Sequence, residues 1–320
     1  MNTLKNKKVL VTGGAGFIGS HLVELIIKER PLSVVVVDNL SIGKETNLKE
    51  SRKLFPLLKL YKKNAADFSV MRNIVKRHNI DVVFNLAAIP LPSSLIHPKA
   101  DVDEMVSMVT TVCELQRLGH FKTLINFSSS EVYGTALRNP MGENHPLGAH
   151  TPYAAAKAAG DLIVLSYCRT FNLDSTILRP FNNYGPRQNE KNYAAVIPLT
   201  IKRILNNESP LIFGDGKQTR DFIYVSDTAK MAIKVFKNGK TRGKVINVGS
   251  GRAISILKLV TQISEILDYK GKVEFRDKRP GDVRKLIAGT KVAESLLDFK
   301  PEVSWKVGLT KTIAWYKDNL

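Results

Sequence analysis

A glycine-rich turn close to the N-terminus is the feature that most restricts how this chain can fold. The apolar run Val9-Leu10-Val11 is followed by Gly13-Gly14-Ala15-Gly16-Phe17-Ile18-Gly19, and apolar residues then recur at helical spacing as far as about Glu29. Pro31 marks the end of that helix. The segment is therefore predicted to run from a β-strand through a glycine turn directly into a helix, the opening unit of an α/β fold.

The same alternation of strand and helix continues through the first 180 residues. The valine run at 34–37 is typical of a parallel strand that is covered on both faces. Further strands are predicted at 57–61, 82–86, 123–127 and 175–178, separated by helices near 69–78, 101–118 and 152–170. This order predicts an α/β fold built on a Rossmann-type doubly wound parallel sheet.

The regular alternation fades after Arg179-Pro180, where a loop rich in Asn, Gly and Pro precedes short mixed segments. We therefore expect residues 1–180, rejoined by part of 220–250, to form one domain, and residues 181–320 to form mainly a smaller mixed α/β lobe. In such a fold a ligand lies outside the carboxyl ends of the strands. The expected binding site is the cleft between the two parts.

The glycines of the turn suit a phosphate-binding site. Gly13 permits the tight turn, Gly16 lets the backbone approach a pyrophosphate, and Gly19 lets helix and strand pack closely. Asp38 closes the second strand, where a carboxylate can hydrogen-bond the hydroxyls of an adenosine ribose and would repel a 2′-phosphate. A plain structural turn is the alternative, but strand, turn, helix and acid stand in the order of a dinucleotide site. We expect NAD, rather than NADP, as the cofactor.

Tyr153 and Lys157 form a candidate catalytic pair. They stand four residues apart in a predicted helix, so their side chains share one face. A lysine ammonium beside a phenol is expected to lower the pKa of Tyr153. Such a tyrosine can take a proton from a sugar hydroxyl while the carbon beneath it gives hydride to a nicotinamide. Ser128-Ser129-Ser130-Glu131 follows the strand at 123–127, where an active site belongs.

Five motifs stand in a characteristic order along the chain. They are Thr12-Gly13-Gly14-Ala15-Gly16-Phe17-Ile18-Gly19, Asn85-Leu86-Ala87-Ala88, Ser128-Ser129-Ser130-Glu131-Val132-Tyr133-Gly134, Tyr153-Ala154-Ala155-Ala156-Lys157 and Arg179-Pro180-Phe181-Asn182-Asn183-Tyr184-Gly185-Pro186-Arg187. The set resembles extended short-chain dehydrogenases/reductases, specifically the NAD-dependent nucleotide-sugar epimerases and dehydratases, from about residue 7 to the C-terminus. The resemblance implies an enzyme that holds NAD and modifies a nucleotide-diphosphate sugar.

The resemblance also implies roles for single residues. Ser129 would hydrogen-bond the sugar O4 beside Tyr153, Lys157 would also hold the nicotinamide ribose, and Asp67 with Phe68 would lie at the adenine. The implied cofactor contacts are Gly13, Gly16, Phe17, Ile18, Gly19, Asp38, Asn39, Asp67, Phe68, Leu86, Ala87, Ala88, Tyr153 and Lys157.

The implied substrate contacts lie in the second half of the chain. Asn182 resembles the asparagine that contacts the substrate diphosphate, and Phe213 resembles the wall of the base pocket. Arg220 and Arg279 resemble the arginines that grip the diphosphate and the nucleotide, a use that suits the forked guanidinium group. Val196 is a further implied contact.

The helix at 101–118 departs from the family pattern. An asparagine often stands near its start, whereas this chain has Glu104-Met105-Val106-Ser107, so a relay or water that used that asparagine is in doubt. The helices at 101–118 and 152–170 resemble the pair that forms a homodimer in the family. The residues expected to supply apolar dimer surface are Val102, Met105, Val109, Leu162, Leu165 and Tyr167.

Three reactions remain open within the family, and all begin by oxidising the sugar at C4. A dehydratase needs an extra base, commonly a glutamate at the place of Glu131. Our first prediction is therefore an NDP-sugar dehydratase, with a UDP-sugar as the favoured substrate. Hexose 4,6-dehydratases often carry an aspartate acid where this chain has Ser130. A Ser-Glu pair at these positions also resembles uronic-acid decarboxylases and some UDP-N-acetylhexosamine dehydratases. A 4-epimerase is the close alternative and a decarboxylase the third. A non-enzymatic NAD sensor or scaffold is the remaining alternative, which intact Ser129, Tyr153 and Lys157 argue against.

The amino-acid composition limits the kinds of molecule that the chain is expected to bind. The net charge of +19 favours an anionic partner, but the basic residues are spread along the chain without a dense block, so no nucleic-acid function is expected. No apolar stretch is long enough to span a membrane, and we expect a cytoplasmic protein. Cys113 and Cys168 lie far apart without neighbouring ligands, so no metal site is expected.

Overall fold

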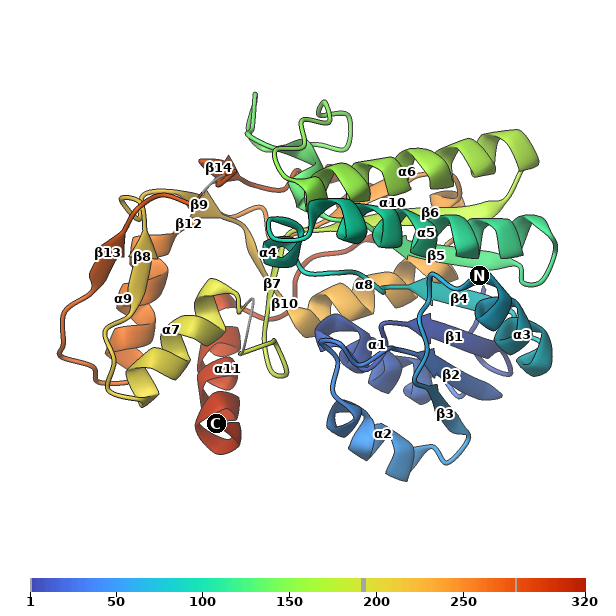
Figure 1. Ribbon diagram of the computed structural model, residues 1–320, viewed down its shortest axis with the longest axis horizontal. Coiled ribbons are helices and arrows are strands. Elements are labelled where there is room, and N and C mark those ends of the chain that lie inside the picture. The colour runs from blue at the N-terminus through green and yellow to red at the C-terminus, as the bar shows by residue number, and fades with distance from the viewer. Residues whose placement is uncertain (1, 191–193, 280) are drawn as a thin grey trace.

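The computed structural model describes residues 2–190, 194–279 and 281–320, and a parallel sheet of seven strands runs through them. The strand order is β11-β6-β5-β4-β1-β2-β3 (Figure 1). The bounds are β1 (Lys8–Thr12), β2 (Ser33–Val37), β3 (Leu58–Tyr61), β4 (Val82–Asn85), β5 (Thr123–Phe127), β6 (Asp174–Pro180) and β11 (Val245–Val248). The predicted doubly wound parallel sheet is confirmed.

Helices cover both faces of this sheet (Figure 1). Alternate strand residues point to opposite faces, so Val9 and Val11 join one core while Leu10 joins the other. The first face carries α1 (Phe17–Lys28), α8 (Val225–Lys237) and α10 (Lys291–Leu297). The second carries α3 (Phe68–His78), α5 (Pro98–Arg117) and α6 (Pro152–Phe171). Burial on both faces explains why the strands are nearly continuous apolar runs.

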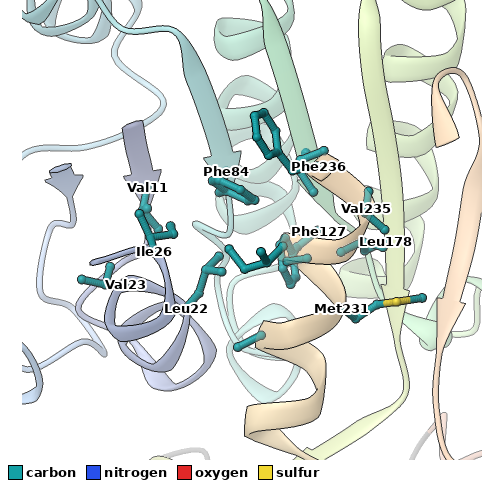
Figure 2. Close-up of a cluster of buried hydrophobic side chains, with 14 of the residues drawn as sticks. Val11, Leu22, Val23, Ile26, Phe84, Phe127, Leu178, Met231, Val235 and Phe236 are labelled. Carbon is teal, nitrogen blue, oxygen red and sulfur yellow. The ribbon is translucent and has the colours of Figure 1, made fainter. Parts of the chain in front are cut away.

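The core between the sheet and the α1–α8 layer is drawn in Figure 2. Leu22 and Ile26 of α1 and Phe236 of α8 lie against Phe84 and Phe127 of the strands, all within the same buried cluster. Burying an apolar side chain of this size contributes about 1.5–3 kcal/mol. The returning segment of α8 and β11 is therefore packed into the sheet layer, although it follows the lobe segments β7 to β10 in the sequence.

A smaller lobe, at the left of Figure 1, has a separate apolar core. Its helices are α7 (Val196–Leu205), α9 (Ile256–Ile266) and α11 (Trp305–Asn319). Its strands and the strands that lead to it are β7 (Asn182–Tyr184), β8 (Leu211–Phe213), β9 (Thr219–Arg220), β10 (Phe222–Tyr224), β12 (Ile254–Ser255), β13 (Glu274–Arg276) and β14 (Lys285–Leu286). The remaining short elements are η1 (Glu45–Leu48), α2 (Lys49–Leu54), α4 (Leu91–Ser94), η2 (Ser130–Tyr133) and η3 (Gly239–Thr241).

Two expectations from the sequence need correction. The segment that was predicted as a loop after Pro180 contains β7, which pairs in parallel with β10, a partner too distant in sequence for local patterns to reveal. Met105 and Val109 of α5 are buried within the chain itself and so do not supply apolar dimer surface. Leu162 of α6 is exposed, as that prediction requires.

Among the described residues, no helix has the length and apolar character needed to cross a membrane.

Candidate active site

A cavity of about 600 Å³ opens at the carboxyl ends of the sheet strands. Its lining combines residues that follow β1, β2, β4 and β5 with residues of the smaller lobe. A ligand is expected at this end of a doubly wound sheet. All predicted site residues except Asp67 and Phe68 line this cavity.

The glycine turn brings backbone close to the cavity. Gly13 has a φ of 65°, and a Cβ atom there would lie 2.8 Å from the backbone nitrogen of Ala87. A Cβ atom at Gly19 would lie 2.1 Å from the carbonyl oxygen of Gly13, so only glycine allows α1 to start this close to the turn. Gly16 is the N-cap of α1 and supplies no capping side chain, which leaves the helix N-terminus to an anion such as a pyrophosphate.

Asp38 lies at the end of β2 beside the glycine turn. Its carboxylate accepts hydrogen bonds from the backbone nitrogens of Ala15, at 3.0 Å, and Leu40, at 2.9 Å. Burial raises the pKa of Asp38, and the backbone donors oppose that rise. Gly43 lies so close that a Cβ atom there would be 2.9 Å from both carboxylate oxygens. The glycine cradle and this fixed acid fit a bound NAD, with the acid at the adenosine ribose.

A buried polar chain holds the segment after β4 in place. The Thr12 hydroxyl donates to Asn85 at 2.6 Å, and Asn85 donates to Asn126 at 2.8 Å. The Thr12 oxygen also accepts from the backbone nitrogens of Leu86 and Ala87. These bonds link the ends of β1, β4 and β5, so Leu86, Ala87 and Ala88 line the cavity at a fixed depth.

Asp67 and Phe68 lie away from the cavity lining. Asp67 is the N-cap of α3 and accepts a hydrogen bond from the backbone nitrogen of Val70 at 2.9 Å. The residues that line the cavity there are Asn64 and Ala65, a few positions earlier. An aspartate directly before a helical pattern is a capping signal, which accounts for the observed role of Asp67. The contact of Asp67 and Phe68 with the adenine stays a prediction.

Tyr153, Lys157 and Ser129 line the cavity together. Helix α6 begins with Thr151 as N-cap, which accepts a hydrogen bond from the Ala154 nitrogen at 3.2 Å, so Tyr153 lies in the first turn. The Lys157 ammonium donates to the carbonyl oxygen of Phe127 at 2.9 Å, which ties α6 to the end of β5. Ser129 follows that strand as the N-cap of η2.

The pKa of Tyr153 differs from the sequence expectation. Burial raises it to about 12, and the Glu131 carboxyl adds to the rise while the Ser129 hydroxyl opposes it. Burial lowers the pKa of Lys157 to about 8. The expectation that Lys157 acidifies the phenol is therefore wrong for this structure, because burial outweighs every other influence and the ammonium is engaged with Phe127.

Glu131 and Ser130 lie on η2 and line the same cavity. The Glu131 backbone nitrogen donates to the Ser129 hydroxyl at 3.2 Å, which fixes the start of η2. Burial raises the pKa of the Glu131 carboxyl, Arg220 and His150 lower it, and Asp282 raises it. A carboxyl with a raised pKa beside Tyr153 is suited to proton transfer.

The predicted substrate residues line the cavity on the lobe side. The Arg279 guanidinium lies 3.8 Å from the centre of the Phe213 ring, a cation–π stack. Arg220 forms a partly buried ion pair with Asp282 and donates to the carbonyl oxygen of Val283 at 2.8 Å. The Asn182 amide nitrogen is buried and has no hydrogen-bond partner within the part of the chain that the structure describes. Val196 opens α7 and also lines the cavity.

Comparisons with known proteins agree with this geometry. A family model described as the NAD dependent epimerase/dehydratase family matches residues 9–249. A putative UDP-glucose 4-epimerase from Methanocaldococcus jannaschii is 34% identical over 97% of this chain and 99% of its own length. A UDP-N-acetyl-alpha-D-glucosaminuronate decarboxylase from Bacillus cytotoxicus is 34% identical over 98% of both chains.

A solved structure of a dTDP-glucose 4,6-dehydratase from Streptomyces venezuelae with NAD bound superposes with a TM-score of 0.92. It is 28% identical, and the match covers 98% of this chain and 97% of that chain. These relatives are named as enzymes, which argues against the alternative of a non-enzymatic NAD sensor or scaffold. The chain belongs to the NAD dependent epimerase/dehydratase family and is an NAD-dependent enzyme that modifies nucleotide sugars.

Proposed function

We propose that this enzyme is a nucleotide-sugar dehydratase, with a UDP-sugar as the favoured substrate. The observation that carries the proposal is the Glu131 carboxyl, which lies in the cavity beside Tyr153 and has a pKa raised by burial. A 4-epimerase needs little beyond the serine and the tyrosine. A carboxyl that is partly shielded from water in a cavity costs free energy and is best explained by a proton transfer that needs it.

The proposed roles follow from the neighbours of each side chain. Tyr153 takes the O4 proton, Ser129 hydrogen-bonds O4, and Lys157 holds the nicotinamide ribose and supplies positive charge. Bound NAD would accept hydride from C4 and return it later in the same turnover. Gly13, Gly16 and Asp38 hold the pyrophosphate and the adenosine ribose.

The elimination step is assigned to η2. Once C4 is a ketone, the C5 hydrogen is acidic, so the Glu131 carboxylate removes it and the C6 hydroxyl leaves as water. Ser130 lies on the same short helix and offers a hydroxyl rather than an acid. We therefore assign to Glu131 both proton transfers: it takes the C5 proton and delivers a proton to the departing oxygen.

The smaller lobe is proposed to bind the rest of the substrate. Residues 181–320, apart from the segment that returns to the sheet, would form this nucleotide-sugar lobe, and residues 1–180 the NAD domain. Asn182, with its unpartnered buried amide nitrogen, is a donor for the diphosphate. Arg279 and Arg220 supply charge to the diphosphate and the nucleotide, and the Phe213 ring forms the wall of the base pocket.

Two other reactions remain as alternatives. Relatives at similar identity include a putative 4-epimerase and a decarboxylase, so similarity alone does not choose between them. A test incubates the purified enzyme with UDP-, dTDP-, GDP- and CDP-sugars and measures product masses. Loss of water supports the dehydratase, whereas loss of carbon dioxide or an unchanged mass with an inverted C4 overturns it. Glu131→Gln keeps the side-chain shape and should abolish water loss, while the exposed-site variant Asp103→Asn should not.

A further inference from the structure

A buried carboxylate lies behind the catalytic lysine. Tyr153, Lys157 and Asp161 follow one another at intervals of four residues on α6, so the three side chains share one helix face. Asp161 is 1% exposed, and its Oδ2 atom accepts a hydrogen bond from Arg179 Nε at 2.8 Å. Its other oxygen, Oδ1, is also buried. The Ser128 hydroxyl, at the end of β5, lowers the pKa of this carboxyl as a hydrogen-bond donor. None of the steps assigned above uses this carboxylate.

Arg179 connects Asp161 to the loop that carries the other catalytic groups. Its guanidinium donates to the Tyr133 hydroxyl at 2.9 Å and lies 4.8 Å from the centre of that ring. Tyr133 closes η2, and its hydroxyl donates to Asn247 of β11 at 2.7 Å. The guanidinium therefore fixes α6 and η2 to each other, and both elements contribute to the cavity.

We propose that Asp161 is a positioning residue that holds the Lys157 side chain as an ammonium ion, with Arg179 fixing the carboxylate in place. The inference rests on the roles proposed for Tyr153 and Lys157, and it is independent of whether the enzyme dehydrates or epimerises its sugar. Lys157 is buried and would otherwise lose its proton more readily. Among the described residues, the charged group that acts on the Lys157 ammonium is Asp161 on α6. Arg179 on β6 pairs with Asp161, and the Glu131 carboxyl on η2 acts on the Tyr153 phenol.

The electrostatics agree with this geometry. Burial lowers the pKa of Lys157 to about 8, and among the described residues Asp161 is the charged neighbour that opposes this fall. Burial raises the pKa of Asp161, and Arg179, the Ser128 hydroxyl and, last, Lys157 oppose that rise. Removing the carboxylate should therefore release the Lys157 proton at lower pH, by about one unit or more, the usual effect of one nearby opposite charge.

The test compares Asp161→Asn with wild type by NMR of protein labelled with carbon-13 at lysine Cε. The Lys157 signal is assigned by its loss in Lys157→Met. We expect its titration midpoint to fall by about one pH unit or more in Asp161→Asn, and the alkaline limb of the pH–rate profile for sugar oxidation to move in the same direction. Asp103→Asn, at an exposed site on α5, and Tyr133→Phe are matched controls that should leave the midpoint unchanged.

A purely structural role for Asp161 would lower the rate equally at every pH and leave the Lys157 midpoint in place, and that result overturns the proposal. If Asp161→Asn does not fold, the double variant Asp161→Asn/Arg179→Met removes both charges and should fold. A downward shift is expected in it too, but a smaller one, because loss of the Arg179 positive charge partly offsets loss of the carboxylate. A wild-type enzyme that never releases water would overturn the dehydratase proposal but leave this titration unaffected.

Discussion

Replacing Arg179 with methionine is expected to destabilise the fold strongly. The Asp161 and Arg179 side chains are 1% and 4% exposed, and 2.8 Å separates the Arg179 Nε and Asp161 Oδ2 atoms. Methionine has a similar length but carries no charge, so Arg179→Met leaves the Asp161 carboxylate buried and unpaired. It also removes the hydrogen bond to the Tyr133 hydroxyl.

The expected loss is about 3–5 kcal/mol, the range for removing one partner of a buried ion pair. That is a large share of a total stability of about 5–15 kcal/mol. The double variant Asp161→Asn/Arg179→Met leaves no unpaired charge and should recover much of the loss. Lys99→Ala removes one partner of the exposed pair Lys99–Asp103 and should leave stability unchanged within error.

The loss should also depend on pH. Burial already raises the pKa of Asp161, and without Arg179 it rises further. A carboxyl with a folded-state pKa above its unfolded value of about 3.9 is destabilising as an anion, so the loss is smallest below that value and grows as pH rises through the folded pKa. Urea unfolding of both proteins at several pH values measures this. A loss below about 1 kcal/mol at neutral pH, or one that does not change with pH, refutes the reasoning.

Three further predictions use other parts of the site. Tyr153→Phe should keep the fold and NAD binding but reduce turnover by about 10² to 10⁴, and a variant with more than about a tenth of wild-type activity would show that another group is the base. Asp38 should make the enzyme bind NAD more tightly than NADP in calorimetry, because a 2′-phosphate meets its carboxylate, and equal affinities would contradict this. The exposed Leu162 on α6 should lie in a homodimer interface, so light scattering should give twice the 35.6 kDa chain mass, and a monomer at micromolar concentration would exclude the dimer.

Much of the sheet could be predicted from the sequence because its strands are buried on both faces. β5 was expected at 123–127 and spans Thr123–Phe127, and α6 was expected at 152–170 and spans Pro152–Phe171. A strand of this kind is a local apolar run, and an amphipathic helix is a local period. The short strand β7 could not be predicted, since only its partner β10 stabilises it.

The positions of site residues could be predicted where a sequence motif fixes the backbone conformation. The pKa values of site residues could not, because they depend on burial in the folded chain. Gly13 and Asp38 line the cavity as expected, because a glycine turn at a strand end restricts the fold strongly. The raised pKa of Tyr153 depends on how far the cavity wall shields its phenol from water, which no spacing reveals. Asp161 was not singled out, because its pairing with Arg179 joins α6 to β6 across the sheet layer.

Solvent exchange at the sugar C5 tests the role of Glu131 most directly. The wild-type enzyme, turning over its nucleotide sugar in heavy water, should incorporate deuterium at C5 as Glu131 removes that proton and water is lost. Glu131→Gln should still reduce bound NAD when substrate is added, visible as reduced-nicotinamide absorbance, yet incorporate no deuterium. Wild-type turnover without deuterium at C5 would contradict the dehydratase mechanism and favour the 4-epimerase.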